Sequence, residues 1–250
     1  YKYSTRQILY TKADLGLATG KKGIIKSIYF KYGYSSATTT KTNVDIYMVN
    51  SDITELSTSA GHYVTVTASD KVYSGVLNGS GEDTWNEIVL TTPFNYNGAG
   101  NLIVVIDDNS GSCESSSSFV FNAHTTSTNY SQLATYSDNT NANPSATTTW
   151  TGASTSNIRP STKFCIQESD MDEYTVNWYV NSATPVHSQT GYAGTALTNI
   201  PEPESSDCDG EKVFVGWYTE SYSDEDDAPE FVNPTIIPEG GANYYAVFAN

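Results

Sequence analysis

Apolar and polar residues alternate in many short stretches of this sequence, and each stretch ends in residues typical of turns. A period of two is the pattern of a β-strand that buries one face. Apolar residues at the spacing of an α-helix persist for no more than about two turns anywhere in the chain. The 19 tyrosines and the many threonines also favour strands, because both side chains suit a pleated, half-buried surface. We therefore predict an all-β protein.

Strand-like stretches follow one another through the first 168 residues with polar turns between them, which is typical of an antiparallel sandwich. They are Gly23–Gly33, Asn43–Asn50, His62–Ala68, Lys71–Gly79, Trp85–Leu90, Leu102–Ile106, Ser118–His124, Tyr130–Ser137 and Ser161–Gln167. The stretch Tyr10–Gly16 predicts one helical turn. The segment Asp138–Asn157 is rich in Asn, Thr and Ser, so we expect a loop exposed at one end of the sandwich that is either mobile or functional.

The composition changes abruptly at the charged segment Gln167–Glu173, and we place a domain boundary there, with domains at 1–168 and 169–250. The first part carries 11 basic and 13 acidic residues, whereas the second carries one basic residue, Lys212, and 15 acidic ones. The second part is long enough for a small β-domain with its own modest core. Its strand-like runs are Tyr174–Asn181, Val186–Leu197, Lys212–Thr219 and Ala242–Asn250.

The net charge of −16 limits the partners of this chain. It repels phosphate backbones and anionic lipid, which argues against nucleic acid and bare membrane surfaces. No segment approaches the roughly 18 consecutive apolar residues of a membrane helix, so we expect no membrane insertion. The sequence does not begin with a charged segment and an apolar core, so we expect a mature ectodomain whose signal has been removed. An acidic surface keeps an extracellular protein soluble, and we expect a monomer.

Three cysteines, Cys113, Cys165 and Cys208, form no C-x-x-C pair and have no histidine at metal-ligand spacing. Their odd number excludes a fully paired intramolecular set. Two interpretations stay open. Cys113 and Cys165 bridge if their strands are neighbours, or all three are buried or incidental thiols.

The apolar run Leu102–Ile106 leads directly into Asp107, Asp108 and Asn109. Successive side chains of a strand point to opposite faces, so the two aspartates do not form a catalytic pair around one bond. A turn at the strand end, however, gathers side-chain and carbonyl oxygens, which are the ligands that calcium prefers. Asp107, Asp108 and Asn109 are therefore candidate calcium ligands, and the alternative is that they form the polar end of a strand.

Aromatic residues outside the strand cores are candidates for stacking on sugar rings, because Trp and Tyr combine a flat apolar face with a polar rim. Trp150, in the long loop, and the tyrosines Tyr130 and Tyr136 are the candidates for a glycan-binding platform. The alternative for Trp150 is a side chain with which the loop covers the core. Three other tryptophans lie within strand patterns, and we expect them in the core: Trp85, Trp178 and Trp217.

No catalytic motif is present. His62, His124 and His187 are scattered, and neither H-E-x-x-H nor G-x-S-x-G occurs. The four consecutive acids Asp224–Asp227 are best explained as a solvated loop, because like charges repel one another. We expect no enzyme activity, and a glycosidase that uses two carboxylates is the catalytic alternative.

The second part resembles the Listeria–Bacteroides type repeat, which also occurs as the internalin B-repeat. The resemblance rests on Phe214, Gly216 and Trp217 in an F-x-G-W strand and on the run Tyr245–Phe248 in a final Y-x-A-V/I-F strand. It covers nearly all of residues 174–250. It implies a small β-grasp-like module that serves bacterial surface proteins as a spacer or interaction unit, and it transfers no catalytic residues.

The first part resembles the jelly-roll domain of cleaved-adhesin or gingipain-adhesin type, in surface proteins of Bacteroides relatives. The resemblance rests on "IKSIYFKYG", "NVDIYMVN", "NLIVVIDDNSG" and the closing "RPSTKF" at Arg159–Phe164, over residues 1–168. It implies an adhesion or ligand-binding sandwich that in some members carries calcium. The chain lacks the second long acidic loop usual in this family, which puts a metal in doubt.

Together these observations predict a jelly-roll β-sandwich followed by a β-grasp-like repeat, in a non-catalytic adhesin or binding protein. We expect it to be secreted or attached to the surface of a Gram-negative bacterium, where sandwich loops recognise a glycan or a host or matrix protein. Two alternatives stay open. The chain is a carbohydrate-binding module of a larger hydrolase, or it consists of structural spacer domains.

Overall fold

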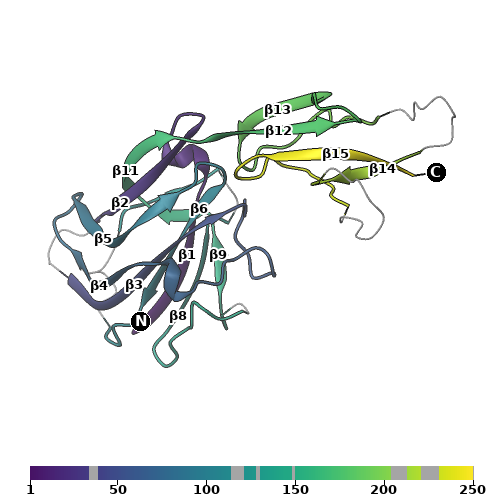
Figure 1. Ribbon diagram of the computed structural model, residues 1–250. Helices are drawn as coiled ribbons and strands as arrows, with labels where there is room; N and C mark the ends of the chain where they lie inside the picture. The colour runs from purple at the N-terminus through teal and green to yellow at the C-terminus, as the bar shows by residue number, and fades with distance from the viewer. Residues whose placement is uncertain are drawn as a thin grey trace. The chain divides into compact units, whose positions relative to one another are not determined.

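Antiparallel β-strands form the framework of the computed structural model, as the alternation in the sequence predicts (Figure 1). The structure describes residues 1–33, 39–113, 121–127, 130–147, 150–203, 213–220 and 231–249. Within these ranges the only helical segments are two short 3-10 turns, η1 (Lys12–Leu15) and η2 (Ala68–Asp70), and none has the length and hydropathy to cross a bilayer. The all-β class is confirmed, and η1 lies where the sequence predicts a helical turn.

The chain folds into two compact units, Tyr1–Asp170 and Met171–Asn250. The division falls just after the expected boundary at residue 168, because the last strand of the first unit keeps its pairing as far as Asp170, opposite Lys21. The side chains of these two residues form an ion pair, with 2.5 Å between Lys21 Nζ and Asp170 Oδ1.

Six antiparallel strands form the larger sheet of the N-terminal unit, in the order β4-β3-β6-β1-β8-β9. Their bounds are β1 Tyr3–Tyr10, β3 Thr39–Ser51, β4 Lys71–Gly79, β6 Asn101–Asp108, β8 Gln132–Ser137 and β9 Ser154–Ser156. The strand β1 pairs with β6 on one side and with β8 on the other, yet the sequence did not predict it. Its pattern does not alternate, because both of its faces lie against protein.

A three-stranded antiparallel sheet, in the order β11-β2-β5, packs against one face of the larger sheet and completes the sandwich. Its bounds are β2 Lys21–Lys31, β5 Trp85–Tyr96 and β11 Thr162–Asp170. The turn from β5 to β6 places Gly98 at φ 76°, the left-handed conformation that an Asn-Gly pair favours. Two short strands, β7 (Ala123–Thr125) and β10 (Ile158–Pro160), pair with each other.

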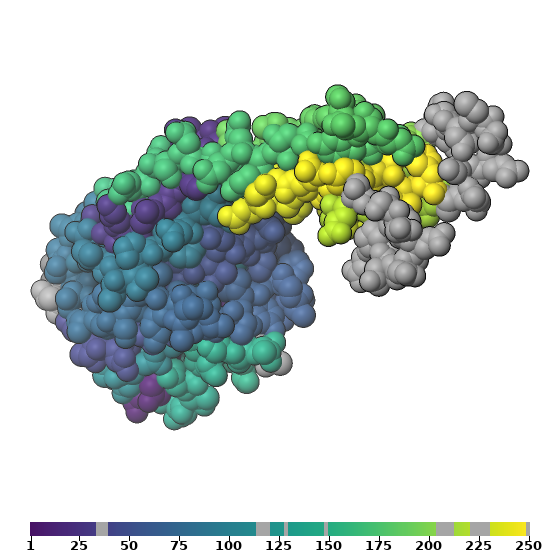
Figure 2. All heavy atoms as spheres, in the orientation of Figure 1, coloured from purple at the N-terminus to yellow at the C-terminus, as the bar shows by residue number. Residues whose placement is uncertain are grey.

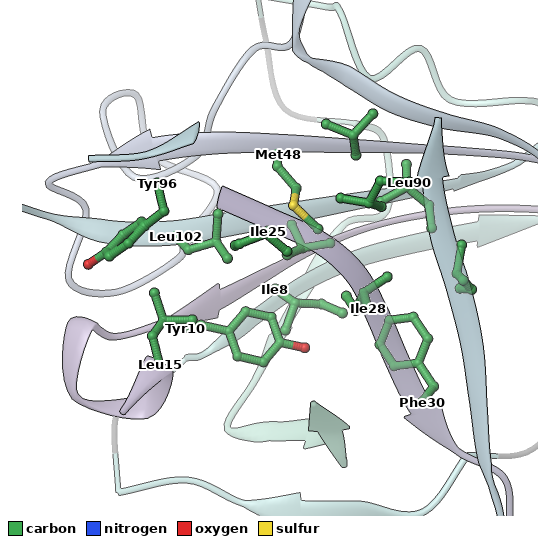
Figure 3. Close-up of a cluster of buried hydrophobic side chains, with 14 of the residues drawn as sticks. Ile8, Tyr10, Leu15, Ile25, Ile28, Phe30, Met48, Leu90, Tyr96 and Leu102 are labelled. Atoms are coloured by element: carbon green, nitrogen blue, oxygen red, sulfur yellow. The ribbon is translucent and has the colours of Figure 1, made fainter. Parts of the chain in front are cut away.

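The main core fills the space between the two sheets (Figure 3). Ile25, Ile28 and Phe30 of β2 are almost fully buried and face residues of the larger sheet such as Ile8 and Met48. The space-filling view shows the N-terminal unit, coloured purple to teal, as a closely packed body (Figure 2). Each fully buried aliphatic side chain of this kind contributes about 1.5–3 kcal/mol, so this core is the main source of stability of the sandwich.

A second core lies on the opposite face of the six-stranded sheet, where loops replace a second sheet. Ile103 and Val105 of β6 point to this face, whereas Leu102 and Val104 point to the main core. Both faces of β6 are therefore buried, which explains why its sequence is a continuous apolar run. The covering residues come from two loops and include Leu56, Val66 and Trp150.

One expectation about these loops is wrong. The stretch His62–Ala68 alternates like a strand but forms none before η2 begins at Ala68, because a side chain takes the place of a strand partner. The Gln7 amide donates to the carbonyl of Val64 at 2.6 Å and accepts from its backbone N–H at 2.9 Å. The described parts of the segment 138–157 are mostly exposed, as expected, and a few of their side chains cover the sheet face, where Thr135 Oγ1 donates to the carbonyl of Thr151 at 3.0 Å.

The C-terminal unit is a four-stranded sheet in the order β13-β12-β15-β14, in which only β12 and β15 run parallel. Its bounds are β12 Glu173–Tyr179, β13 His187–Tyr192, β14 Val213–Tyr218 and β15 Ala242–Ala249. Trp178 and Trp217 lie in its core, as expected. A side chain on Gly216 would overlap the ring of Phe231, which explains the glycine of the F-x-G-W pattern.

Candidate functional site

Asp107 and Asp108, at the end of β6, point to opposite faces of the six-stranded sheet. The hydroxyl of Thr5 donates to Asp107 at 2.8 Å and also contacts the carbonyl of Ala142 in the covering loop at 3.4 Å, which places Asp107 on the loop-covered face. Asp108 instead forms a buried ion pair with Lys41, with 3.0 Å between Lys41 Nζ and Asp108 Oδ2. The alternation expected from the sequence is observed here.

Every carboxylate oxygen of the two aspartates already has a partner. The second oxygen of Asp107 accepts from the amide of Asn109 at 2.8 Å. The remaining oxygen of Asp108 accepts from the backbone N–H of Ser110 at 3.0 Å and from its hydroxyl at 2.5 Å. These bonds form the Asx-type turn that ends the strand.

Asp107, Asp108 and Asn109 therefore do not fit a calcium ion as a common ligand set. Calcium takes about six to eight oxygens that converge on one point, whereas these two carboxylates diverge and one of them faces an ammonium group. Among the described residues, no three His, Cys, Asp or Glu side chains form a group that could hold a metal. The observed arrangement corresponds to the alternative interpretation, the polar end of a strand.

A second carboxylate lies directly across from Asp107, because Asp45 on β3 is its cross-strand neighbour. Burial raises the pKa of Asp107, and the nearby Asp45 adds to this effect. Burial acts in the same direction on Asp45, but the ammonium of Lys71, at 2.7 Å, outweighs it and lowers the pKa of Asp45. The ion pair between Asp45 and Lys71 links the neighbouring strands β3 and β4.

Trp150 is not an exposed platform, and the expectation of a sugar-stacking Trp150 is wrong. Its side chain is 9% exposed and packs in the second core. Its indole N–H donates to the carbonyl of Asn143, in the same loop, at 2.9 Å. The physical reason is that the second face of the sheet needs an apolar cover, and the largest side chain of the loop supplies it.

Tyr130 and Tyr136 are exposed, at 48% and 49%. Tyr130 precedes β8 and Tyr136 lies near its end, so about 20 Å of extended chain separates them. The ring of Tyr136 already lies against that of Tyr1, with 4.3 Å between the ring centroids. The structure thus does not gather the three predicted ligand-binding residues into one site.

Trp85, which we expected in the core, is half-buried and lies on the outer face of the three-stranded sheet. It begins β5, where Ile88 and Leu90 point into the main core. Trp85 has the same parity as Glu87 and Val89, which face solvent. That shared parity with a charged residue was the signal in the sequence that could have placed Trp85 outside.

The outer face of the three-stranded sheet combines aromatic and charged side chains. Lys163 of β11, Tyr29 of β2 and Glu87 of β5 lie in one row across it. The hydroxyl of Tyr29 donates to Glu87 at 2.6 Å. The ammonium of Lys163 reaches over the ring of Trp85, 4.0 Å from its centroid. Val89, 63% exposed, continues this surface. Trp85, Tyr29, Glu87, Val89 and Lys163 are called the outer platform below.

A concave site of about 330 Å³ also opens in the N-terminal unit, around Arg159 of β10. It is lined by Tyr10, Asp14, Leu15, His124, Arg159, Thr162, Lys163 and Phe164. Arg159 forms a two-pronged ion pair with Asp14, at 2.7 and 2.9 Å, and donates to the carbonyl of Leu9 at 2.9 Å. Its Nε donates to His124 at 3.4 Å.

The polar groups of this concave site are engaged mainly with one another. Burial alone would raise the pKa of Asp14, but hydrogen bonds from Arg159 and Thr11 outweigh it and lower the pKa to about 2. The pKa of Tyr10 is raised, chiefly by burial. Since Arg159 is only 8% exposed, the cluster acts as a clamp that holds β10 against β1 and η1.

Two thiols can be placed. Cys113 and Cys165 are free and exposed, so the interpretation of a disulfide between them is wrong, and the two residues are incidental thiols and not buried ones. Cys165 lies on the outer face of β11, opposite Ser27. Cys208 and the acidic run Asp224–Asp227 lie outside the described residues.

Comparisons with known proteins return no match to any family model, curated protein or solved structure. The resemblances to adhesin-type and repeat-type domains therefore stay proposals. The N-terminal unit offers two candidate surfaces, the concave site around Arg159 and the outer platform.

Proposed function

We propose that this chain is a non-catalytic recognition protein of the bacterial cell surface whose N-terminal unit binds glycans on the outer platform. The single observation that carries the proposal is the position of Trp85 on the open face of a sheet. A residue on this face does not contribute to the core, so the fold does not need an aromatic side chain there. In the concave site, by contrast, Arg159 is already paired.

An open sheet face suits a saccharide chain. Trp85 and Tyr29 provide apolar ring surface for stacking on sugar rings, because each ring has a flat apolar face and a polar rim. Exposed polar residues of neighbouring strands, such as Gln167 and Asn95, lie in the same plane and can bond sugar hydroxyls. Recognition then uses the sheet face in place of the loop that carries Trp150.

The setting we propose follows from the sequence. The adhesin-like first unit is the recognition domain and the repeat-like second unit, with its acidic surface, is a spacer or second contact, at the surface of a Gram-negative bacterium or secreted from it. A carbohydrate-binding module of a larger hydrolase would use the same platform. A pure spacer would use no platform at all, so ligand binding separates it from the other two.

The test is a glycan array probed with the whole chain, with Trp85→Ala and with Tyr136→Ala. Tyr136 is the matched control because it is an exposed aromatic residue outside the platform. We expect Trp85→Ala to lose the saccharide signal and Tyr136→Ala to keep it. Loss in the Tyr136 variant alone would move the site to β8, and silence of the unmodified chain would refute glycan binding and favour the spacer.

A further inference from the structure

We infer that the outer platform selects acidic saccharides, those that carry a carboxylate on the sugar ring. This inference rests on the proposed glycan-binding function and specifies its ligand. The observation behind it is that the Lys163 ammonium lies over the Trp85 ring, on which a sugar would stack.

The ammonium of Lys163 lies 4.0 Å from the centroid of the Trp85 ring. A cation over an indole face is attracted by the ring electrons, and at an exposed site this attraction is modest. A neutral sugar that stacks on this face displaces the ammonium and leaves it without a partner. An acidic sugar displaces the ammonium too, but the sugar carboxylate then pairs with it. The acidic ligand thereby replaces the ammonium–ring attraction that a neutral ligand only removes.

The charge of this sheet supports the same class of ligand. Five of the 12 basic residues of the chain lie on two of its three strands, with four on β2 and one on β11. The three strands carry three acidic residues, Glu87, Glu168 and Asp170, so the sheet keeps a positive excess although Asp170 pairs with Lys21. Near the platform, Lys31 is paired with Asp83 at 3.0 Å, while Lys26 is exposed. The chain as a whole has a net charge of −16 and repels polyanions. Binding of an acidic saccharide must therefore come from a local positive site, which this sheet provides.

The geometry limits the ligand further. The row Lys163, Tyr29 and Glu87 begins on the edge strand β11 and ends on the edge strand β5, and the Lys163 side chain reaches from β11 across to the Trp85 ring on β5. A bound uronate places its carboxylate toward β11, because Glu87 on β5 repels it. Tyr29 lies on the central strand β2 and Trp85 on the edge strand β5, and their rings receive the sugar face.

The test measures binding of the whole chain to polygalacturonate, alginate and hyaluronan, and to the carboxyl-reduced form of each, by calorimetry. Reduction turns each uronate into its neutral sugar and leaves the backbone otherwise unchanged. We expect the acidic form of at least one polymer to bind and its reduced form to bind at least about tenfold more weakly. We expect Lys163→Gln to weaken binding of the acidic form by about twofold to fivefold, since an exposed charge pair contributes at most about 1 kcal/mol. The same variant should not weaken binding of the reduced form, which no longer has to displace the ammonium from the Trp85 ring.

Two variants serve as controls. Lys2→Gln removes the same charge from an exposed position outside the platform and should leave binding unchanged. Trp85→Ala should abolish binding of the acidic form, and circular dichroism and melting of each variant confirm that it folds. The Lys163 variant keeps the test valid if Trp85→Ala does not fold.

The outcomes separate the two levels of the proposal. Equal binding of acidic and reduced forms, or preference for neutral glycans in a Trp85-dependent manner, overturns the acidic preference and leaves glycan binding intact. Equal weakening by Lys2→Gln and Lys163→Gln also overturns it, because the effect is then one of net charge. No binding of any saccharide, acidic or neutral, overturns both.

Discussion

Replacement of Trp150 by alanine should destabilise the N-terminal unit without affecting ligand binding. The indole is 9% exposed and packs in the core beneath the covering loops, beside residues such as Leu56 and Val66. Its N–H also holds the carbonyl of Asn143 at 2.9 Å, which closes the loop on itself. Alanine removes both the cover of the sheet face and this hydrogen bond.

The magnitude follows from burial. Truncation of a buried Trp to Ala costs about 3–5 kcal/mol, a range that includes the lost contacts and the cavity. For a unit of this length, each kcal/mol shifts the melting temperature by about 2–4 °C, so we expect a fall of about 6–20 °C. Trp150→Phe keeps most of the apolar volume and loses only the N–H donor, so it should cost about 1–2 kcal/mol.

The assay is thermal and urea unfolding of the whole chain followed by circular dichroism, with Tyr136→Ala as a surface control that should change stability by less than about 0.5 kcal/mol. The same variants are then tested on the glycan array. If Trp150→Ala melts like the unmodified protein and loses saccharide binding, Trp150 is a ligand platform and its placement in the second core is refuted.

Four further perturbations test other parts of the structure. Arg159→Ala removes a buried guanidinium that bonds the partly exposed carboxylate of Asp14 and the carbonyl of Leu9. It should lower the unfolding free energy by about 1.5–3 kcal/mol in urea titration, and a loss below about 1 kcal/mol would contradict a clamp. The pKa of Asp14 is about 2 in the folded state, below the unfolded value, so its contribution is present above pH 4 and is lost as the pH falls toward 2. We expect about 1–2 kcal/mol of acid-dependent loss after solvent screening, and Asp14→Asn should show a flatter pH profile, whereas an unchanged profile would exclude Asp14 as its source. Gly216→Ala should destabilise the C-terminal unit by about 1–3 kcal/mol in thermal melts because its Cβ overlaps Phe231, and Phe231→Ala should remove most of that cost if the overlap is its cause. Calcium at millimolar concentration should not raise the melting temperature relative to EDTA, and a rise that disappears in Asp107→Asn would show that a calcium site forms at the end of β6.

Only part of the outer platform could be predicted from strand patterns in the sequence. The parity of Trp85 with Glu87 in β5 was visible in the sequence, yet aromatic residues in strands are most often buried, and the assignment to the core followed that rule. The approach of Lys163 to Trp85 was not visible, since nearly eighty positions separate them and only the pairing of β11 and β5 with β2 brings them together. Strand parity could therefore have placed Trp85 on the outer face, but it could not predict which other residues surround it there.

Local alternation, together with residues such as Gly98 that tolerate a left-handed backbone, is enough to predict the all-β class, most strand positions and the turns between them. The strand Lys71–Gly79 has the bounds expected from its pattern. Tertiary structure decided which face of each strand was covered, and by what. Trp150 is buried because the second face of the six-stranded sheet has loops over it, and the segment around Val64 is not a strand because Gln7 satisfies its backbone. Burial is a property of the assembled sheets, and no local pattern specifies which face a distant segment will cover.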